Sequence, residues 1–111
     1  MNSSYYQNQI NRLEKDIADL QKKIADENKK EIDKNKQIDS VHRTINKNTS
    51  ISTLNSKQRQ IDGYQKDILN CRTKIASYQK SIATKSAELG KKSFVFNELV
   101  NVAFDTINKF V

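Results

Sequence analysis

Apolar residues recur at every seventh position through two long stretches of an otherwise polar chain. In residues 74–89, KIASYQKSIATKSAEL, the apolar residues Ile75, Ile82 and Leu89 are spaced in this way. Two apolar positions in seven are enough for the seam of a coiled coil, and a strict seven-residue repeat implies left-handed supercoiling. The repeat therefore predicts long α-helices that pair along a narrow apolar seam.

The composition supports an elongated helical chain. Its 111 residues include no proline and two glycines, and 35% are hydrophobic. Long helices without tight turns have this profile, whereas a rounded core needs a larger apolar share. At this length the chain is one domain at most, and we expect the all-α class.

The repeat occupies two columns in each half of the chain, with Glu27, Glu31 and Lys34 interrupting the first half. Buried charged residues are costly unless they are paired. This polar gap indicates either a locally loosened coil or a docking site for a partner, and the nearby Ile32 is expected to lean in and cover it. The predicted seam comprises Ile10, Leu13, Ile17, Leu20, Ile24, Ile38, Val41, Ile45, Leu54, Ile61, Tyr64, Ile68, Cys71, Ile75, Tyr78, Ile82 and Leu89.

Between the halves lies NKNTSIST, residues 46–53, whose side chains favour turns and helix N-caps. Thr49, Ser50 and Ser52 are the candidate caps. Folding the chain here sets Ile45 opposite Leu54, and the same register pairs Ile38 with Ile61, Ile24 with Ile75, Ile17 with Ile82 and Ile10 with Leu89. Ile68 then meets Glu31. One continuous helix also fits the repeat but leaves this symmetry unexplained. We therefore predict an antiparallel two-helix coiled-coil hairpin over residues 1–92, with arms at about 4–46 and 52–90 and a turn at about 47–51.

The last part of the chain has a different pattern. Gly90, followed by two lysines, is typical of a helix C-terminus with a left-handed glycine. Residues 93–111 then repeat apolar side chains at three-and-four spacing, which predicts a short C-terminal amphipathic helix capped by Ser93. Such a face needs a covering surface. The predicted partner or oligomer face comprises Phe96, Leu99, Val100, Phe104, Ile107 and Phe110.

The second arm is basic, with nine basic and three acidic side chains in residues 51–92. A basic stripe is one requirement of a surface that follows a phosphate backbone, and a solvated helix surface is the competing interpretation. The candidate nucleic-acid contacts are Lys66, Arg72, Lys74 and Lys80.

No motif points to catalysis or to a cofactor. The lone cysteine, Cys71, falls at a seam position and is expected to fill space there, and the lone histidine, His42, has no partner for a zinc cluster. No apolar run is long enough to span a membrane, and the N-terminal sequence is unlike a signal peptide. We therefore expect a non-enzymatic, cytoplasmic protein without metal or cofactor.

Residues 50–89 resemble the coiled-coil region that precedes the TIR domain in some bacterial TIR-domain proteins. The matching pieces are Ser52-Thr53 with Ser56-Lys57, Lys66-Asp67-Ile68, Lys74-Ile75-Ala76 and Ser81-Ile82-Ala83. The resemblance implies an assembly or regulatory coil in a defence or signalling protein. We expect no NAD-consuming TIR domain within these 111 residues, so the chain is either a stand-alone relative or a fragment whose last helix begins a further domain.

Three functional hypotheses follow. The first is an interaction module that forms a homo-oligomer or holds a protein partner through its coil and its apolar tail. The second is a nucleic-acid-binding rod that uses the basic second arm. The third is a helical-hairpin partner of a type VII secreted toxin, which ranks last because the chain lacks a Trp-x-Gly turn and is basic.

Overall fold

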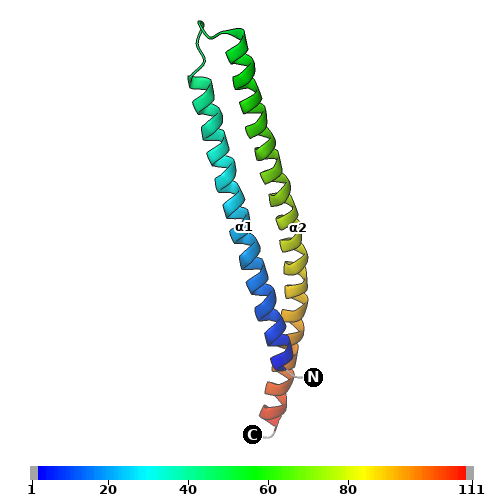
Figure 1. Cartoon of the computed structure of the whole chain (residues 1–111). Helices are drawn as coiled ribbons and strands as arrows, with labels where there is room; N and C mark the ends of the chain where they lie inside the picture. Colours follow the sequence, from blue (N-terminus) through cyan, green and yellow to red (C-terminus); the bar gives the residue numbers. More distant parts are fainter. Residues whose placement is uncertain (1–2, 110–111) are drawn as a thin grey trace. The chain divides into compact units, whose positions relative to one another are not determined.

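The computed structural model describes residues 3–109, which form two α-helices. Helix α1 covers Ser3–Arg43, helix α2 covers Ile51–Lys109, and residues 44–50 connect them (Figure 1). The described residues contain no strand, so the all-α prediction is confirmed. Within residues 3–109, neither helix contains a stretch apolar enough to cross a membrane.

The chain divides into two compact units, and the helices are antiparallel in each. The first unit pairs residues 3–21 of α1 with residues 79–109 of α2. There Lys92 lies over the ring of Tyr6, and Lys85 forms an ion pair with Asp16 further along α1.

The second unit, residues 22–78, is a hairpin that contains the connection. In it Lys57 donates a hydrogen bond to Thr44 near the connection, and Lys23 lies over the ring of Tyr78 at the other end. As residue numbers rise along α1, those of their partners fall along α2, as the predicted hairpin requires.

Side-chain hydrogen bonds close the connection. The amide N–H of Asn46 donates to the Thr49 hydroxyl (2.9 Å), and the Asn46 side chain accepts from the amide of Asn48 (2.8 Å). The Ser50 hydroxyl accepts from the amide of Thr53 (3.2 Å), which makes Ser50 the N-cap of α2.

The connection begins earlier than predicted, and this affects two predicted seam residues. Helix α1 ends at Arg43, so Ile45 lies in the connection and Leu54 has no facing helical turn of α1. Leu54 is exposed, whereas Ile45 stays half-buried. The Asn- and Thr-rich segment ends the helix sooner because these side chains bond to the local backbone in place of helical partners.

The seam itself is thin. Five of its apolar residues are buried: Ile10 and Leu13 from α1, and Ile61, Ile68 and Cys71 from α2. Apart from the exposed Leu54, the other predicted seam residues are half-buried, as expected for two helices that cover each other on one side only. These half-buried residues are Ile17, Leu20, Ile24, Ile38, Val41, Ile45, Tyr64, Ile75, Tyr78, Ile82 and Leu89.

The prediction that a helix ends at Gly90 is wrong. Gly90 has no positive φ, and α2 continues through it to Lys109. One glycine inside a helix costs only about 1 kcal/mol, and the residues on either side are compatible with a helix and include no proline. Residues 93–109 are therefore the last turns of α2 and not a separate helix capped by Ser93.

Removing side-chain volume from the seam should destabilise the hairpin. Ile68 is 6% exposed, whereas its neighbour Leu69 is 60% exposed on the outer side of α2. We expect Ile68→Ala to lower the free energy of unfolding by about 2 kcal/mol or more, and Leu69→Ala to change it by less than about 0.5 kcal/mol. Urea unfolding followed by circular dichroism measures both, and equal losses would contradict the seam.

Gly90→Ala tests the continuity of α2. A Cβ at Gly90 would meet no atom within 4 Å, and the backbone there is helical. We therefore expect Gly90→Ala to stabilise the protein by about 0.5–1 kcal/mol. A left-handed C-cap glycine would give the opposite sign, so a loss of stability in the same unfolding experiment would contradict the continuous helix.

Candidate interaction surface

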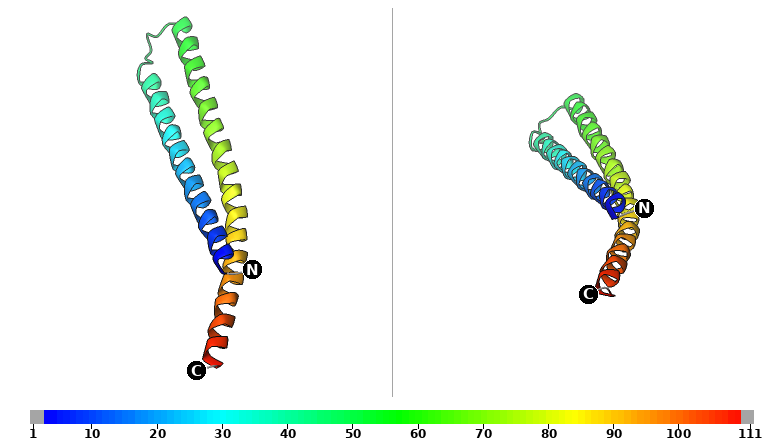
Figure 2. Two further views of the ribbon diagram at one scale, coloured as in Figure 1. Left: turned by 60° about the horizontal axis from the view of Figure 1, so that its bottom comes forward. Right: turned by 90° about the horizontal axis from the view of Figure 1, so that it is seen from below.

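The end of α2 extends past the start of α1. Ser3 and Ser4, the first described residues of α1, line a shallow hollow together with Phe96 of α2. Every residue from Asn97 to Lys109 is exposed. The orange-to-red turns of α2 continue beyond the blue start of α1 in Figure 1 and in both views of Figure 2. We call residues 97–109 the overhang.

The overhang presents the same side of α2 that packs against α1. Because α2 is one helix, the seven-residue column that contains Ile82 and Leu89 continues directly to Phe96 and Ala103. A helix advances about 100° per residue, so four further apolar residues lie on one broad side of α2, from about 40° on one side of this column to about 100° on the other. They are Leu99, Val100, Phe104 and Ile107. Val102 lies about 100° from the column in the opposite sense, next to Lys109, and is therefore outside this side.

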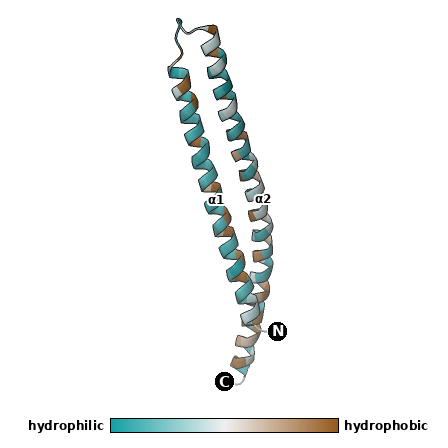
Figure 3. Cartoon of the chain, in the orientation of Figure 1, coloured by the Kyte–Doolittle hydropathy of each residue, from teal (hydrophilic) through white to brown (hydrophobic). Residues whose placement is uncertain are grey.

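These residues with Phe96 and Ala103 form the tail face, which appears as a concentration of white and brown on the last turns of α2 in Figure 3. Phe104 is 64% exposed and Ile107 is 61% exposed. Phe110, the remaining residue of the predicted partner face, lies outside the described residues. The tail face is therefore an apolar continuation of the seam that α1 does not cover from Leu99 onward, whereas Phe96 is half-buried beside the start of α1.

The charged residues of the overhang lie on its other side. Helical spacing sets Glu98, Asp105 and Lys109 away from the tail face. Asn97, Thr106 and Asn108, at its borders, are polar but uncharged. A surface of this kind can bury apolar area without stripping water from an ion.

A second distinctive feature is the polar layer in the unit of residues 22–78. The Glu27 side chain is only 7% exposed, and its Oε1 lies 3.4 Å from Lys30 Nζ and 3.8 Å from Lys74 Nζ. Glu31 accepts a 2.5 Å bond from Arg72, and Lys34 pairs with Asp67 at 3.2 Å. The three residues that interrupt the seam are therefore bridged to the facing helix, and Glu27 is not left to solvent.

Ile32 does not cover this layer, contrary to expectation. It is 54% exposed, because it lies one position beyond the seam column and points away from α2. Ion pairs fill the place that an apolar side chain was expected to take.

The polar layer also sets the properties of the lone cysteine. The pKa of Glu27 lies below its ordinary value of 4.5, mainly because the Cys71 thiol, a weak donor, donates a hydrogen bond to the carboxylate. The positive charges of Lys30 and Lys74 lower this pKa further. Burial, and next the bond to Glu27, raise the pKa of Cys71 above 9.0. The thiol is therefore buried and kept in its protonated form, which suits packing better than nucleophilic chemistry.

Tyrosine–lysine pairs across the helices are a feature that the sequence pattern alone did not reveal. Lys34 Nζ lies 5.4 Å from the ring centroid of Tyr64, and Lys23 Nζ lies 5.8 Å from that of Tyr78. In the other unit Lys92 Nζ lies 5.7 Å from the ring of Tyr6. Cation–π contacts at these distances contribute about 0.5–1 kcal/mol each at exposed sites. A search for lysines opposite the seam tyrosines in the hairpin register would have found them.

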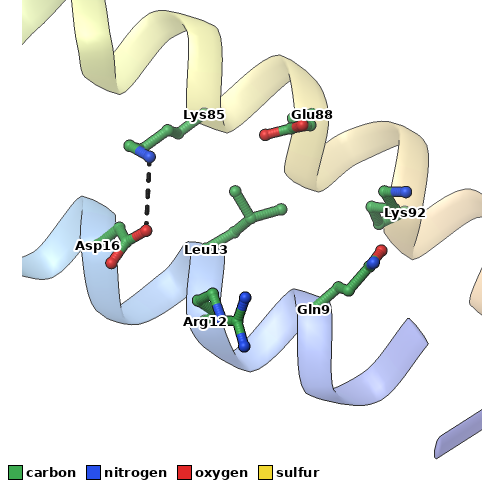
Figure 4. Close-up of a pocket in the computed structure, with 7 residues that line it drawn as sticks. All are labelled: Gln9, Arg12, Leu13, Asp16, Lys85, Glu88 and Lys92. Carbon is green, nitrogen blue, oxygen red and sulfur yellow. Dashed lines mark hydrogen bonds and ion pairs between the residues drawn. The ribbon is translucent and has the colours of Figure 1, made fainter. Parts of the chain in front are cut away.

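The hollow drawn in Figure 4 lies between the helices of the first unit. Gln9, Arg12, Leu13 and Asp16 of α1 line it together with Lys85, Glu88 and Lys92 of α2. The dashed line marks the 3.4 Å ion pair between Lys85 and Asp16. Charges of both signs are mixed around Leu13, and no nucleophile is placed beside a base. Residues 3–109 also contain no group of side chains suited to hold a metal ion.

The four candidate nucleic-acid contacts do not form a free basic stripe. Arg72 is bonded to Glu31 and Lys74 lies beside Glu27, so acidic residues of α1 offset part of their charge. Lys66 and Lys80 are exposed, but they lie about four helical turns apart on α2. This arrangement weakens the case for a phosphate-binding surface.

No known protein-family model matches the chain, and no solved structure matches it either.

The pKa of Glu27 predicts a pH-dependent effect of Glu27→Gln. A carboxylate whose pKa is lowered on folding contributes stability above its unfolded pKa and loses it as the pH falls through the folded value. We expect the wild type to be more stable than Glu27→Gln at neutral pH, and the difference to shrink below about pH 4.5.

Thermal unfolding of both proteins from neutral to acid pH measures this difference. Glu14→Gln is the control, because Glu14 is an exposed glutamate of the same helix. A wild-type advantage that is constant across the pH range would contradict the role of the Glu27 carboxylate.

Proposed function

We propose that the protein is a non-enzymatic coiled-coil module for protein interaction, and that the tail face is the surface through which it associates. The observation that carries this proposal is the exposed apolar continuation of the seam on residues 96–107 of α2. The largest apolar patches of soluble proteins are often functional, and this one lies on an ordered helix with its charges turned away.

The mode of interaction is that of helix pairing. A helical face with apolar residues three and four positions apart binds the complementary face of another helix or a helical groove. Burial of Phe104 and Ile107 supplies the favourable free energy, since each fully buried side chain of this size contributes about 1.5–3 kcal/mol. The part of α2 that pairs with the start of α1 then serves as the support that presents the tail face.

A bacterial defence or signalling system is the setting we propose for this module. The support for it is the resemblance of residues 50–89 to the coiled-coil region that precedes certain TIR domains. In such a setting the module would assemble or regulate an effector domain.

The hairpin of residues 22–78 favours a second candidate, a helical partner of a type VII secreted toxin. In that case the tail face is covered by a helix of the toxin, and the isolated protein stays monomeric. Co-purification with a toxin, lost in a variant with a charge on the tail face, would support this candidate over self-association.

Two exposed residues on different sides of the overhang provide a matched test. Ile107 belongs to the tail face and Val102 does not, yet each is 61% exposed. We expect the wild type to associate in a concentration-dependent way and Ile107→Asp to weaken association by about tenfold or more, because a buried unpaired carboxylate is costly. Val102→Asp should associate as the wild type does.

Size-exclusion chromatography with light scattering gives the mass of each protein over a range of concentrations. Circular dichroism confirms that both variants remain helical. Equal effects of the two substitutions would contradict the tail face as the site of association.

A further inference from the structure

We propose that the partner of the tail face is the tail face of a second copy of this chain, and that the two overhangs pack antiparallel around Ala103. This inference rests on the proposed function and adds the identity of the partner, its direction and its register.

The tail face continues an interface that the chain already forms with itself. Upstream of Asn97, the same column of α2 is covered by an antiparallel helix, α1, through residues such as Ile10 and Leu13. The first described residues of α1, Ser3 and Ser4, lie beside Phe96 of α2. From Asn97 to Lys109, no residue of α1 covers the column, and every residue is exposed. The geometry that completes the seam is therefore another antiparallel helix with a narrow apolar face.

Charge favours a neutral apolar partner. The tail face contains no ionisable side chain, and its borders, Asn97, Thr106 and Asn108, are uncharged. It therefore does not select a charged partner, and a second tail face meets it without like-charge repulsion. An anionic membrane suits it less well, because interfacial helices carry lysine and arginine on the polar side, whereas here Glu98 and Asp105 accompany Lys109.

Direction follows from the position of α1. In a parallel pair, the partner's α2 would run upstream of Asn97 along the side that α1 already occupies. In an antiparallel pair, the upstream part of the partner's α2 leads away from this α1. Only the antiparallel arrangement covers residues 97–109 without displacing the existing helix pair.

The register follows from pairing the uncovered stretch with itself. Ala103 is the smallest residue of the tail face, and two large apolar residues, Leu99 and Ile107, lie four positions before and after it. We therefore place Ala103 on the two-fold axis, where it faces its own copy. Leu99 of one chain then lies opposite Ile107 of the other, and the reverse pair is formed as well. A small residue at the axis allows the helices to approach closely, while large apolar residues fill the space on either side.

Cysteine cross-linking of the full-length chain tests the proposal, with Cys71→Ser as the background so that no native thiol competes. A disulfide requires Cα atoms within about 7 Å. Under mild oxidation we expect Ala103→Cys to give a covalent dimer in high yield. Asp105→Cys, on the charged side of the same helix, is the matched control and should give at least about tenfold less.

Two further variants, Leu99→Cys and Ile107→Cys, report the relative direction of the two helices in the dimer. One of them carries a mass tag, so that disulfides between like and unlike chains can be distinguished. In the antiparallel pair each thiol lies about 12 Å along the axis from its own copy, so each protein alone should not cross-link. An equimolar mixture should form the mixed disulfide between the two. Efficient disulfides between like chains, and none between unlike chains, would overturn the antiparallel register.

The outcomes separate this inference from the proposed function. If the protein associates through Ile107 but the cross-links indicate a parallel pair, the module stands and the antiparallel arrangement is wrong. A strict monomer at all concentrations overturns the second copy as partner, and co-sedimentation with anionic phospholipid vesicles by that monomer would assign the tail face to a membrane. Association that is insensitive to Ile107→Asp overturns both proposals.

Discussion

The contact between two narrow rows of apolar side chains is the interaction on which the rest of this structure depends. Each helix buries only one side, and the buried core reduces to a few residues such as Ile61 and Ile68. Such a seam gives little stabilisation per turn, so register has to be specified by more than apolar contact. The bridged charges at Glu27, Glu31 and Lys34 provide that specificity, since a shift of one helix would leave a buried carboxylate unpaired.

The unequal reach of the two helices turns this seam into a binding surface. Helix α2 keeps its apolar column beyond the point where α1 begins, and a continuous helix holds that column on one side. The tail face therefore has the geometry of the seam without its second half. Neither the polar layer nor the hollow around Leu13 offers a comparable surface, because ion pairs within the chain occupy the polar layer and charged side chains of both signs line the hollow.

Periodicity predicted the helices, their antiparallel pairing and the column of seam residues. Burial in a coiled coil requires apolar residues at fixed positions in every seven, and this repeat is visible even in a mostly polar sequence. The prediction failed where a local signal competes with cooperative helix formation. Gly90 followed by lysines is a common helix end, yet one glycine is too weak to stop a helix with good helix formers on both sides. The spacing also led us to expect Ile32 in the polar gap, where the structure has ion pairs between the helices. Long charged side chains reach across the seam, and residue spacing does not reveal such contacts.

Gly90 has one more mechanical consequence. It stands in α2 shortly before the helix loses the cover of α1, and no neighbouring atom approaches the position of its missing side chain. Bends in helices concentrate at glycine, where fewer contacts oppose a change in axis direction. A bound helix that approaches at an angle can therefore tilt the last turns of α2 at this residue without separating α1 from the preceding part of α2.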